Sequence, residues 1–455
     1  MPSCLAGIET EYPVAVFDKS GNRIEPRFVS DAMIRLASKF RFSLPSSQDK
    51  GVHIANGGKI YREAGRDQDY AITEFATAEA SDPFELVRQV ESGNLLMVDL
   101  CRRLREVLPD ARLACAYRHN VCHVTQTSWA THCNVLTTSN SSTLVAHLVP
   151  HLVSKVIIAG GGGFALHEPF TFSLAPRMAT FTSVINRHTT HERPLLNTRE
   201  MSHCSVAARR QHLIGFEILC SHRARVLDVG TTMLITRMID SGLRPGDGVE
   251  LEAPIAALHD FCADPSCSVA ARRKGSRAPL SAVDIQRCYL ELALGHLHAD
   301  FMPPWAARLC ALWSETLDLL ESGAPDSIAD KLDWGMKLAV FREHASRTGG
   351  SWERCRDALL ELDIRFGALD GGIFERLDAE GLLDHRVEGI DNIADALTTP
   401  PHGTRAQLRG EAILELGRAG RTGTAHWDRV CDTSSGRHLD LGDPFDLTVS
   451  WKPSS

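Results

Sequence analysis

Long apolar runs are missing from this sequence of 455 residues. No stretch of about 18 consecutive apolar residues occurs, and the best candidate, near Val153 to Leu166, is interrupted by four glycines. The first residues, Met1-Pro2-Ser3-Cys4, carry neither a basic segment nor an apolar segment of the secretory type. We therefore expect a cytoplasmic protein without a membrane partner.

A basic excess is missing as well. The chain has 49 Lys+Arg against 57 Asp+Glu, a formal net charge of −8, so it does not as a whole attract a polyanion. Hydrophobic residues make up 43% and aromatic residues 6%, which is an ordinary globular composition and excludes extensive disorder. We expect no nucleic-acid partner, although a few local arginines can still hold an anionic ligand.

The usual local signatures of cofactor sites are missing too. The 13 cysteines lack the paired short spacings of a structural zinc site. Because their number is odd and no secretory segment is present, we expect reduced thiols. Residues 160–163 are four glycines, but neither the Lys-Ser/Thr of a P-loop nor the Rossmann spacing accompanies them. That run is more typical of a turn between a helix and a strand.

Hydrophobic periodicity predicts both strands and helices. Strands are expected near residues 3–12, 58–63, 70–78, 111–118, 121–127, 132–137, 170–175 and 213–220, and helices near 30–41, 83–107 and 142–157. Residues 229–394 look mostly helical, and the tail holds a helix near 404–419 and a strand-like end at 424–450. This order favours the α+β class, with an antiparallel sheet packed on helices. We place a large domain at residues 1–384 and a small C-terminal domain at residues 385–455.

Acidic residues recur on neighbouring predicted strands. Glu9 and Glu11 share one face of the first strand, because successive side chains of a strand point to opposite faces. Unpaired carboxylates are costly to bury, so the pair either faces solvent or binds a hard cation such as Mg²⁺ or Mn²⁺. Glu63 and Glu74 lie on two further strands, and His132 on another would complete a mixed oxygen and imidazole site. A surface role for each residue alone is the alternative.

Two arginine-rich segments are candidates for phosphate binding, because the guanidinium fork fits phosphate oxygens. One segment holds Arg199 and Arg209, and the other holds Arg405 and Arg409. Surface salt bridges are the alternative interpretation of both.

Motifs along nearly the whole chain follow one order. They are Gly7-Ile8-Glu9-Thr10-Glu11-Tyr12, Asn56-Gly57-Gly58-x-x-Tyr61, Asp69-Tyr70-Ala71-x-x-Glu74, Leu196-Asn197-Thr198-Arg199-Glu200-x-x-His203, Asp333-Trp334, Thr404-Arg405-Ala406-x-Leu408-Arg409-Gly410-Glu411 and Asp443-Pro444-Phe445. Together they resemble the family of Pup ligase and Pup deamidase, carboxylate–amine ligases of the glutamine synthetase-like superfamily. The total length suits the ligase branch.

The resemblance implies a glutamine synthetase-like fold, a curved antiparallel sheet that binds ATP and Mg²⁺, with a small C-terminal domain beside it. Such a ligase phosphorylates the side-chain carboxylate of the C-terminal Glu of the small protein Pup, and a lysine amine then forms an isopeptide bond. The expected metal ligands are Glu9, Glu11, Glu74 and His132. The expected nucleotide-binding residues are Tyr61, Arg199, Arg209, Arg405 and Arg409.

The chain departs from the family near the expected chemistry. Glu63 stands at the position of the catalytic aspartate, which keeps the charge and adds one methylene. A lysine amine is protonated near pH 7, so its attack needs a base, and Glu63 is our candidate. In the segment 217–225 a family Asn and Glu are replaced by Leu219 and His222, which together with Arg223 and Arg225 predicts a more basic wall.

These departures leave several functions open. The first is an ATP-dependent ligase that acts on Pup or a Pup-like protein and an amine acceptor. The second is the same chemistry on a small amino acid or peptide in a specialised biosynthetic pathway, where an extra carboxylate would suit the basic wall. The third is a Pup deamidase-like or depupylase-like hydrolase, or a non-catalytic binding homologue.

Overall fold

The computed structural model describes residues 4–64, 71–189, 191–199 and 202–453. Asp69, Tyr70 and Glu200, which belong to two of the motifs above, lie outside these ranges. Each of the 13 cysteines of the sequence is a free thiol. Among the described residues, no helix is long and apolar enough to cross a membrane.

A nine-stranded sheet forms the centre of the molecule, in the order β13-β14-β15-β10-β1-β6-β5-β4-β3. Its neighbours pair antiparallel, except that β13 and β14 run parallel. The strands are β1 (Ala6–Tyr12), β3 (Ser43–Pro45), β4 (Val52–Ile54), β5 (Lys59–Ala64), β6 (Ala71–Ala76), β10 (Thr131–Thr137), β13 (Ser183–Asn186), β14 (Pro194–Asn197) and β15 (Arg209–Phe216).

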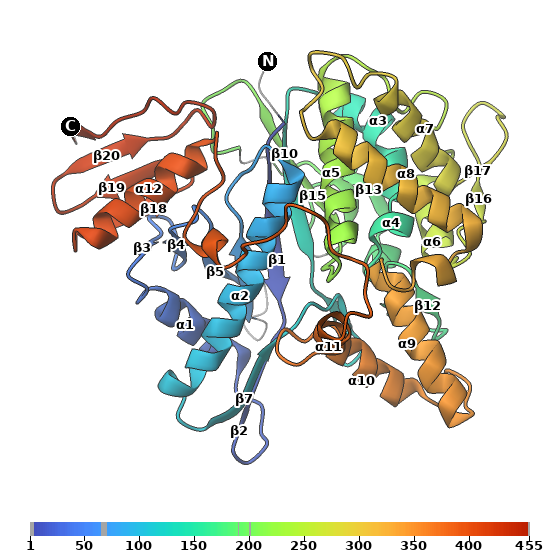
Figure 1. Ribbon diagram of the computed structural model, residues 1–455, viewed down its shortest axis with the longest axis horizontal. Helices are drawn as coiled ribbons and strands as arrows, with labels where there is room; N and C mark the ends of the chain where they lie inside the picture. Colours follow the sequence, from blue (N-terminus) through green and yellow to red (C-terminus); the bar gives the residue numbers. More distant parts are fainter. Residues whose placement is uncertain (1–3, 65–70, 190, 200–201, 454–455) are drawn as a thin grey trace.

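Helices cover one face of this sheet. Three of them lie against the strands, namely α1 (Pro26–Ala37), α2 (Pro83–Val107) and α5 (His222–Asp240) (Figure 1). Ile8, Phe75 and Leu213 point from the strands into the apolar layers beneath these helices. Because strand side chains alternate, Glu9 and Glu11 point to the opposite face, which is therefore the polar face of the sheet.

A helical body packs beside the sheet, and the expectation of a mostly helical segment over residues 229–394 is confirmed. It consists of α3 (Ser141–Ser154), α4 (Val156–Ala159), α6 (Pro254–Cys262), α7 (Ala282–Leu294), α8 (Ala306–Gly323), α9 (Asp333–Thr348), α10 (Arg356–Phe366) and α11 (Ile373–Ala379). Short strand pairs decorate the molecule: β2 (Val14–Asp18) with β7 (Ala111–Ala116), β8 (Val121–Cys122) with β9 (Thr127–Ser128), β11 (Gly163–Phe164) with β12 (Phe172–Ser173), and β16 (Ala270–Ala271) with β17 (Leu280–Ser281).

The end of the chain builds a second, smaller sheet with a helix of its own. Its elements are α12 (Arg405–Arg418), β18 (Gly423–His426), β19 (Arg429–Asp432), β20 (Arg437–Asp440) and β21 (Lys452–Pro453). Ile413, Val430 and Leu441 form its apolar core, which Leu44 and Ala55 of the N-terminal half complete. The predicted boundary at residues 384/385 stays a prediction.

The predicted start of the first helix is wrong. Ser30-Asp31 resembles a helix cap, but α1 begins at Pro26 and ends at Ala37. Proline suits the first helical turn, where its missing N–H costs nothing. Ser30 is buried instead, and its Oγ accepts a hydrogen bond of 3.1 Å from Thr73 Oγ1. Ser30 is therefore polar because it makes a tertiary contact, and it does not cap the helix.

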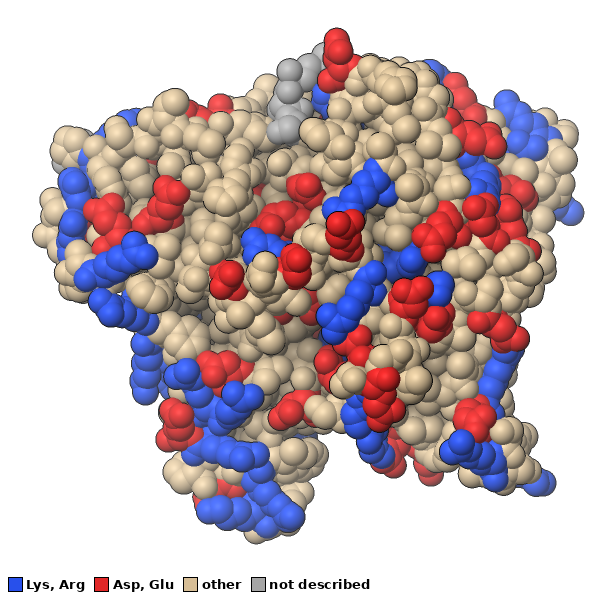
Figure 2. Space-filling view, in the orientation of Figure 1, with Lys and Arg blue, Asp and Glu red and all other residues tan. Residues whose placement is uncertain are grey.

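Charge is unevenly distributed over the surface. Basic side chains gather on the lobe at the lower left of Figure 2, over the paired strands β2 and β7 and the end of α2. Lys19, Arg23 and Arg112 are exposed there. This lobe is therefore locally positive, although the chain as a whole has a net charge of −8.

Candidate active site on the polar face of the sheet

Strand register brings the predicted acidic residues and histidine side by side. Glu9 of β1 lies opposite His132 of β10, and Glu11 lies opposite Glu74 of β6. Tyr61 of β5 is in turn the partner of Glu74. Since cross-strand neighbours share a face, these side chains meet on the polar face of the sheet.

One group of residues has the spacing of a metal site. Ligand atoms of Glu9, His132 and His212 all lie within 4.8 Å of one another. His132 Nδ1 is 3.6 Å from Glu9 Oε2, and Arg210 Nη1 is 3.6 Å from Glu9 Oε1. His212 Nδ1 is 2.7 Å from Asn134 Oδ1, which orients the imidazole ring. The structure therefore offers one carboxylate and two imidazoles to a single ion.

Glu9 is held in its anionic form. Burial alone raises the pKa of Glu9, but the hydrogen bond from His132 and the charge of Arg210 are among the interactions that outweigh it and lower that pKa to about 2. Burial lowers the pKa of His212 to about 3, so its imidazole is neutral at pH 7. An ionised carboxylate and a neutral imidazole are the forms that bind a cation. Burial lowers the pKa of His132, but the hydrogen bond to Glu9 and the charge of Glu11 outweigh it and raise that pKa, so a cation competes with a proton at His132.

The other carboxylates form a second part of the polar face. Glu11 and Glu74 lie outside the 4.8 Å group, and Glu11 Oε2 accepts a hydrogen bond of 2.6 Å from Ala130 N. Burial, followed by repulsion from Glu63 and Glu9, raises the pKa of Glu74. Burial and then the charge of Glu11 raise the pKa of Glu63 to about 7. Carboxylates that repel one another in this way form a donor set that fits a divalent cation.

A cavity of about 150 Å³ opens next to Glu9. It lies between the edge of the polar face and the C-terminal sheet, and its wall combines apolar, aromatic and basic side chains. Among them are Ala6, Thr77, His203, Arg210, Arg405 and Trp427. A cavity of mixed polarity beside an acidic cluster suits the base and phosphates of a nucleotide.

Arg405 and Arg409 are tied to another residue, Glu79. Arg405 Nε and Arg409 Nη2 each lie 2.5 Å from a carboxylate oxygen of Glu79. Arg409 is completely buried and also donates to the carbonyls of Gly57 and Trp427. These contacts join the C-terminal helix to the main sheet, and the predicted binding of a nucleotide by Arg405 and Arg409 stays a prediction.

Arg199 and Arg209 are exposed, whereas Arg210 is the arginine of this region that reaches Glu9. The alternation of β15 explains the difference, since Arg209 and Arg210 must point to opposite faces. A nucleotide contact of Arg199 and Arg209 stays a prediction.

His212 is a site residue that the sequence reading missed. The predicted strand began at residue 213, but β15 begins at Arg209. The alternation of Arg210 and His212 with Gln211 and Leu213 was an available signal for a strand with one polar face. Without knowing that β15 pairs with β10, nothing assigned that face to the acidic cluster.

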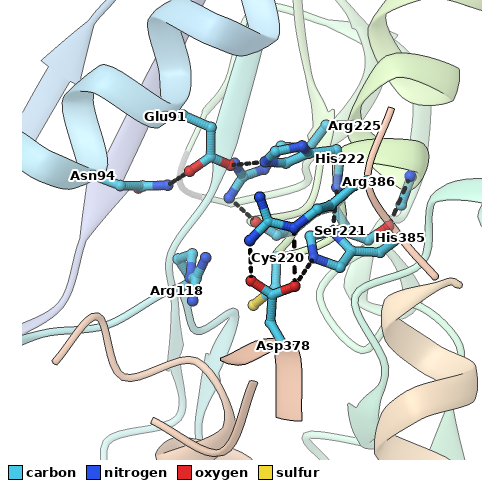
Figure 3. A network of polar contacts seen from close by, with 12 residues as sticks. Glu91, Asn94, Arg118, Cys220, Ser221, His222, Arg225, Asp378, His385 and Arg386 are labelled. Atoms are coloured by element: carbon cyan, nitrogen blue, oxygen red, sulfur yellow. Dashed lines mark hydrogen bonds and ion pairs between the residues drawn. The ribbon is translucent and has the colours of Figure 1, made fainter. Parts of the chain in front are cut away.

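The basic wall predicted from residues 222–225 is wrong. His222, Arg223 and Arg225 lie on α5, on the helical side of the sheet. Figure 3 shows His222 and Arg225 pointing toward Glu91 of α2, and Arg223 Nη2 lies 3.2 Å from Glu315. The charges of Arg223 and Arg225 are thus balanced internally, and burial lowers the pKa of His222 to about 4, so its ring is uncharged at pH 7. The three residues form a structural network between helices.

Comparisons with known proteins identify relatives over nearly the whole chain. A family model described as Pup-ligase protein matches residues 4–431. A Pup–protein ligase of Paenarthrobacter aurescens (strain TC1) is 29% identical over 99% of this chain and 96% of its own length. Pup–protein ligase 1 of Rhodococcus erythropolis is 30% identical over 98% of this chain and 95% of its own length.

Solved structures share the fold. The complex between prokaryotic ubiquitin-like protein Pup and its ligase PafA superimposes with a TM-score of 0.82 at 24% identity, over 98% of this chain and 90% of that one. Pup ligase PafA in complex with ADP gives a TM-score of 0.75 at 23% identity, over 93% of this chain and 92% of that one. The expected α+β architecture, a large and mostly antiparallel sheet packed on helices with a small C-terminal sheet, is confirmed.

The family match and the relatives that cover nearly the whole chain define an ATP-dependent carboxylate–amine ligase. Such an enzyme couples the cleavage of ATP to the formation of an amide bond between a carboxylate and an amine. The match over residues 4–431 makes the assignment specific: the chain belongs to the Pup-ligase family.

Proposed function

We propose that this ligase acts in the cytoplasm on a Pup-like protein, activating the side-chain carboxylate of its C-terminal glutamate with Mg²⁺ and ATP. A lysine amine of an acceptor protein then takes the acyl group. The relatives that match nearly the whole chain are Pup–protein ligases, which supports the choice of acyl donor. The observation that carries the proposal is the convergence of Glu9, His132 and His212 beside Glu63 on one face.

Glu9, His132 and His212 would hold the divalent ion, with Glu11 and Glu74 next to it on the same face. Mg²⁺ bound there supplies charge neutralisation for the phosphates. The cavity lined by Arg210, Arg405 and Trp427 would hold the nucleotide. Tyr61 lies beside Glu74 and not on the wall of this cavity, so a nucleotide contact of Tyr61 stays a prediction.

Glu63 is the proposed base. An attacking lysine amine has to lose a proton, since its pKa is normally about 10.4. The pKa of Glu63 is raised to about 7 by burial and by Glu11, so this carboxylate accepts a proton close to neutral pH. The phosphorylation step turns a poor leaving group, oxide, into phosphate. Amine attack then forms the C–N bond and breaks the acyl C–O bond.

The reason for proposing a small-molecule substrate no longer holds, because the basic residues that suggested it form the internal network described above. A deamidase-like hydrolase would use water in place of the amine on the same face. Product analysis separates the ligase from the hydrolase.

The direct test is ligation with a peptide that ends in glutamate, together with Mg²⁺, ATP and a lysine-containing acceptor. We expect ADP and an isopeptide product from the unaltered protein. Glu63→Gln should keep ATP binding and lower the rate of amide formation by about 10²-fold or more. Glu63→Asp, which restores the family residue, is the matched control. An unchanged ligation rate in Glu63→Gln rules out this base, and ADP formation only with small amino acids rules out the Pup-like donor.

A further inference from the structure

Asn134 of β10 contacts His212, one of the proposed metal ligands. Its Oδ1 lies 2.7 Å from Nδ1 of the His212 ring. The two residues are cross-strand partners in the pairing of β10 with β15, so their side chains share the polar face. The next pairs of the same ladder, such as Val135 with Gln211, continue in register. The backbone of the sheet therefore keeps the amide and the imidazole together.

This contact selects which ring nitrogen of His212 carries the proton. A neutral imidazole has one N–H donor and one nitrogen with a free lone pair. An amide oxygen can only accept a hydrogen bond, so Nδ1 of His212 is the donor in this contact. The lone pair is then on Nε2, and a cation binds an imidazole through such a lone pair.

The metal-binding group depends on that tautomer. Ligand atoms of Glu9, His132 and His212 lie within 4.8 Å of one another. The ring centroids of His132 and His212 are 5.1 Å apart and the ring planes are inclined by 76°, so the rings do not stack face to face. In the opposite tautomer, Nε2 of His212 would carry a hydrogen and could donate it to Glu9. A hydrogen bond of that kind would occupy the carboxylate and compete with the ion.

Asn134 also borders the space proposed for the nucleotide. It lines the cavity of about 150 Å³ together with Glu9 and Arg210. Since Oδ1 is used by His212, the amide N–H groups are the part of Asn134 that is left for a ligand in the cavity. A direct contact with the nucleotide is therefore the alternative role of Asn134 that an experiment has to separate.

We propose that Asn134 is a positioning residue, which holds His212 as the Nδ1–H tautomer and so presents the lone pair of Nε2 to the divalent ion. This inference rests on the proposed function for the ion, and it deepens that function by assigning a residue that acts on the metal through another side chain. A partner of this kind on the second nitrogen of a ligating histidine typically changes metal affinity by about 10- to 100-fold.

Nitrogen-15 NMR of the metal-free protein measures the tautomer without substrate or turnover. Long-range proton–nitrogen correlations near neutral pH distinguish a protonated Nδ1 from a protonated Nε2, and His212→Ala identifies the signals of His212. We expect the Nδ1–H form in the unaltered protein. The Nε2–H form should appear in Asn134→Leu, whereas Asn134→Asp, which keeps an acceptor oxygen, should retain Nδ1–H. An Nε2–H form in the unaltered protein overturns the inference.

Calorimetric titration with Mn²⁺ alone measures the consequence for the metal. Asn134→Leu should weaken Mn²⁺ binding about tenfold or more, and Asn134→Asp should bind no more weakly than the unaltered protein. Because Asn134 acts through His212, Asn134→Leu should have no further effect in a protein that already carries His212→Ala. The matched control is Asn140→Leu, which removes a hydrogen bond of 2.9 Å from Thr143 N at the start of α3 and should leave the Mn²⁺ affinity unchanged.

Three results of these titrations count against the inference. The first is an equal Mn²⁺ affinity of the unaltered protein and Asn134→Leu, including no binding by either. The second is an undiminished additional loss when Asn134→Leu is combined with His212→Ala. The third is weaker binding of metal-free ADP by Asn134→Leu at an unchanged Mn²⁺ affinity, which would assign Asn134 to the nucleotide. The expected tautomer and Mn²⁺ affinities in a protein that forms no isopeptide would instead count against the proposed function alone.

Discussion

At the scale of single residues, His212 tests the proposed metal site. Its ring belongs to the 4.8 Å group with Glu9 and His132, and burial keeps it neutral. We expect His212→Ala to weaken Mn²⁺ or Mg²⁺ binding by roughly tenfold to a hundredfold, because one ligand is lost. Calorimetric titration with the metal alone measures the change. The control is His344→Ala on α9, away from the sheet; equal affinities in both variants would mean that His212 is no ligand.

Prediction from sequence placed some residues of the polar face correctly and missed others. Strand alternation alone placed Glu9 and Glu11 on one face, and the register confirms that Glu74 and His132 join them there. His212 and Arg210 could not be assigned in the same way. Their place depends on the pairing of β15 with β10, a contact between segments about 80 residues apart that no local pattern encodes.

At the scale of elements, a helix start was predicted correctly where a local capping signal had no competing tertiary contact. Asp82 caps α2 by accepting a hydrogen bond of 2.8 Å from Phe84 N, and Pro83 occupies the first turn, so the predicted helix 83–107 is confirmed. The start of α1 failed because Ser30 serves a tertiary contact with Thr73. Side chain–backbone caps are readable from sequence, whereas side chain–side chain contacts across the fold are not.

The link between α12 and the main sheet gives a pH prediction at the same scale. Burial alone raises the pKa of Glu79, but Arg409 and Arg405 outweigh it and hold that pKa well below its usual value of about 4.3. A carboxylate with a depressed pKa stabilises the fold above its ordinary pKa, and this contribution is lost as the pH falls through the lower, folded-state pKa.

Glu79→Gln should therefore lower the free energy of unfolding by about 3–5 kcal/mol at pH 7, because the two arginines lose their buried counter-charge. The gap to the unaltered protein should narrow as the pH is lowered from 5 toward 2. Denaturant unfolding at a series of pH values measures both effects, with the exposed Glu411→Gln as control. A loss that stays constant over that pH range would contradict the assignment of the stabilisation to the Glu79 carboxylate.

At the scale of the whole molecule, ligand binding should be visible as stability. A non-hydrolysable ATP analogue with Mg²⁺, at about 100 times its Kd, should stabilise the fold by about 2.7 kcal/mol and raise Tm by a few degrees. Omitting Mg²⁺ should remove most of this shift, because the phosphates would then face Glu9 without a neutralising charge. Glu9→Ala should lose the Mg²⁺-dependent part. An equal shift with and without Mg²⁺ would separate nucleotide binding from the acidic cluster.

The order in which the site is assembled has a consequence for protein synthesis. The metal-binding group joins residue 9 to residues 132 and 212, and the clamp on Glu79 comes from Arg405 and Arg409. A nascent chain on the ribosome therefore carries Glu9 and Glu11 long before it carries their partners. A chain that stops before Arg405 would lack both guanidinium partners of Glu79 and would leave this carboxylate without its counter-charge.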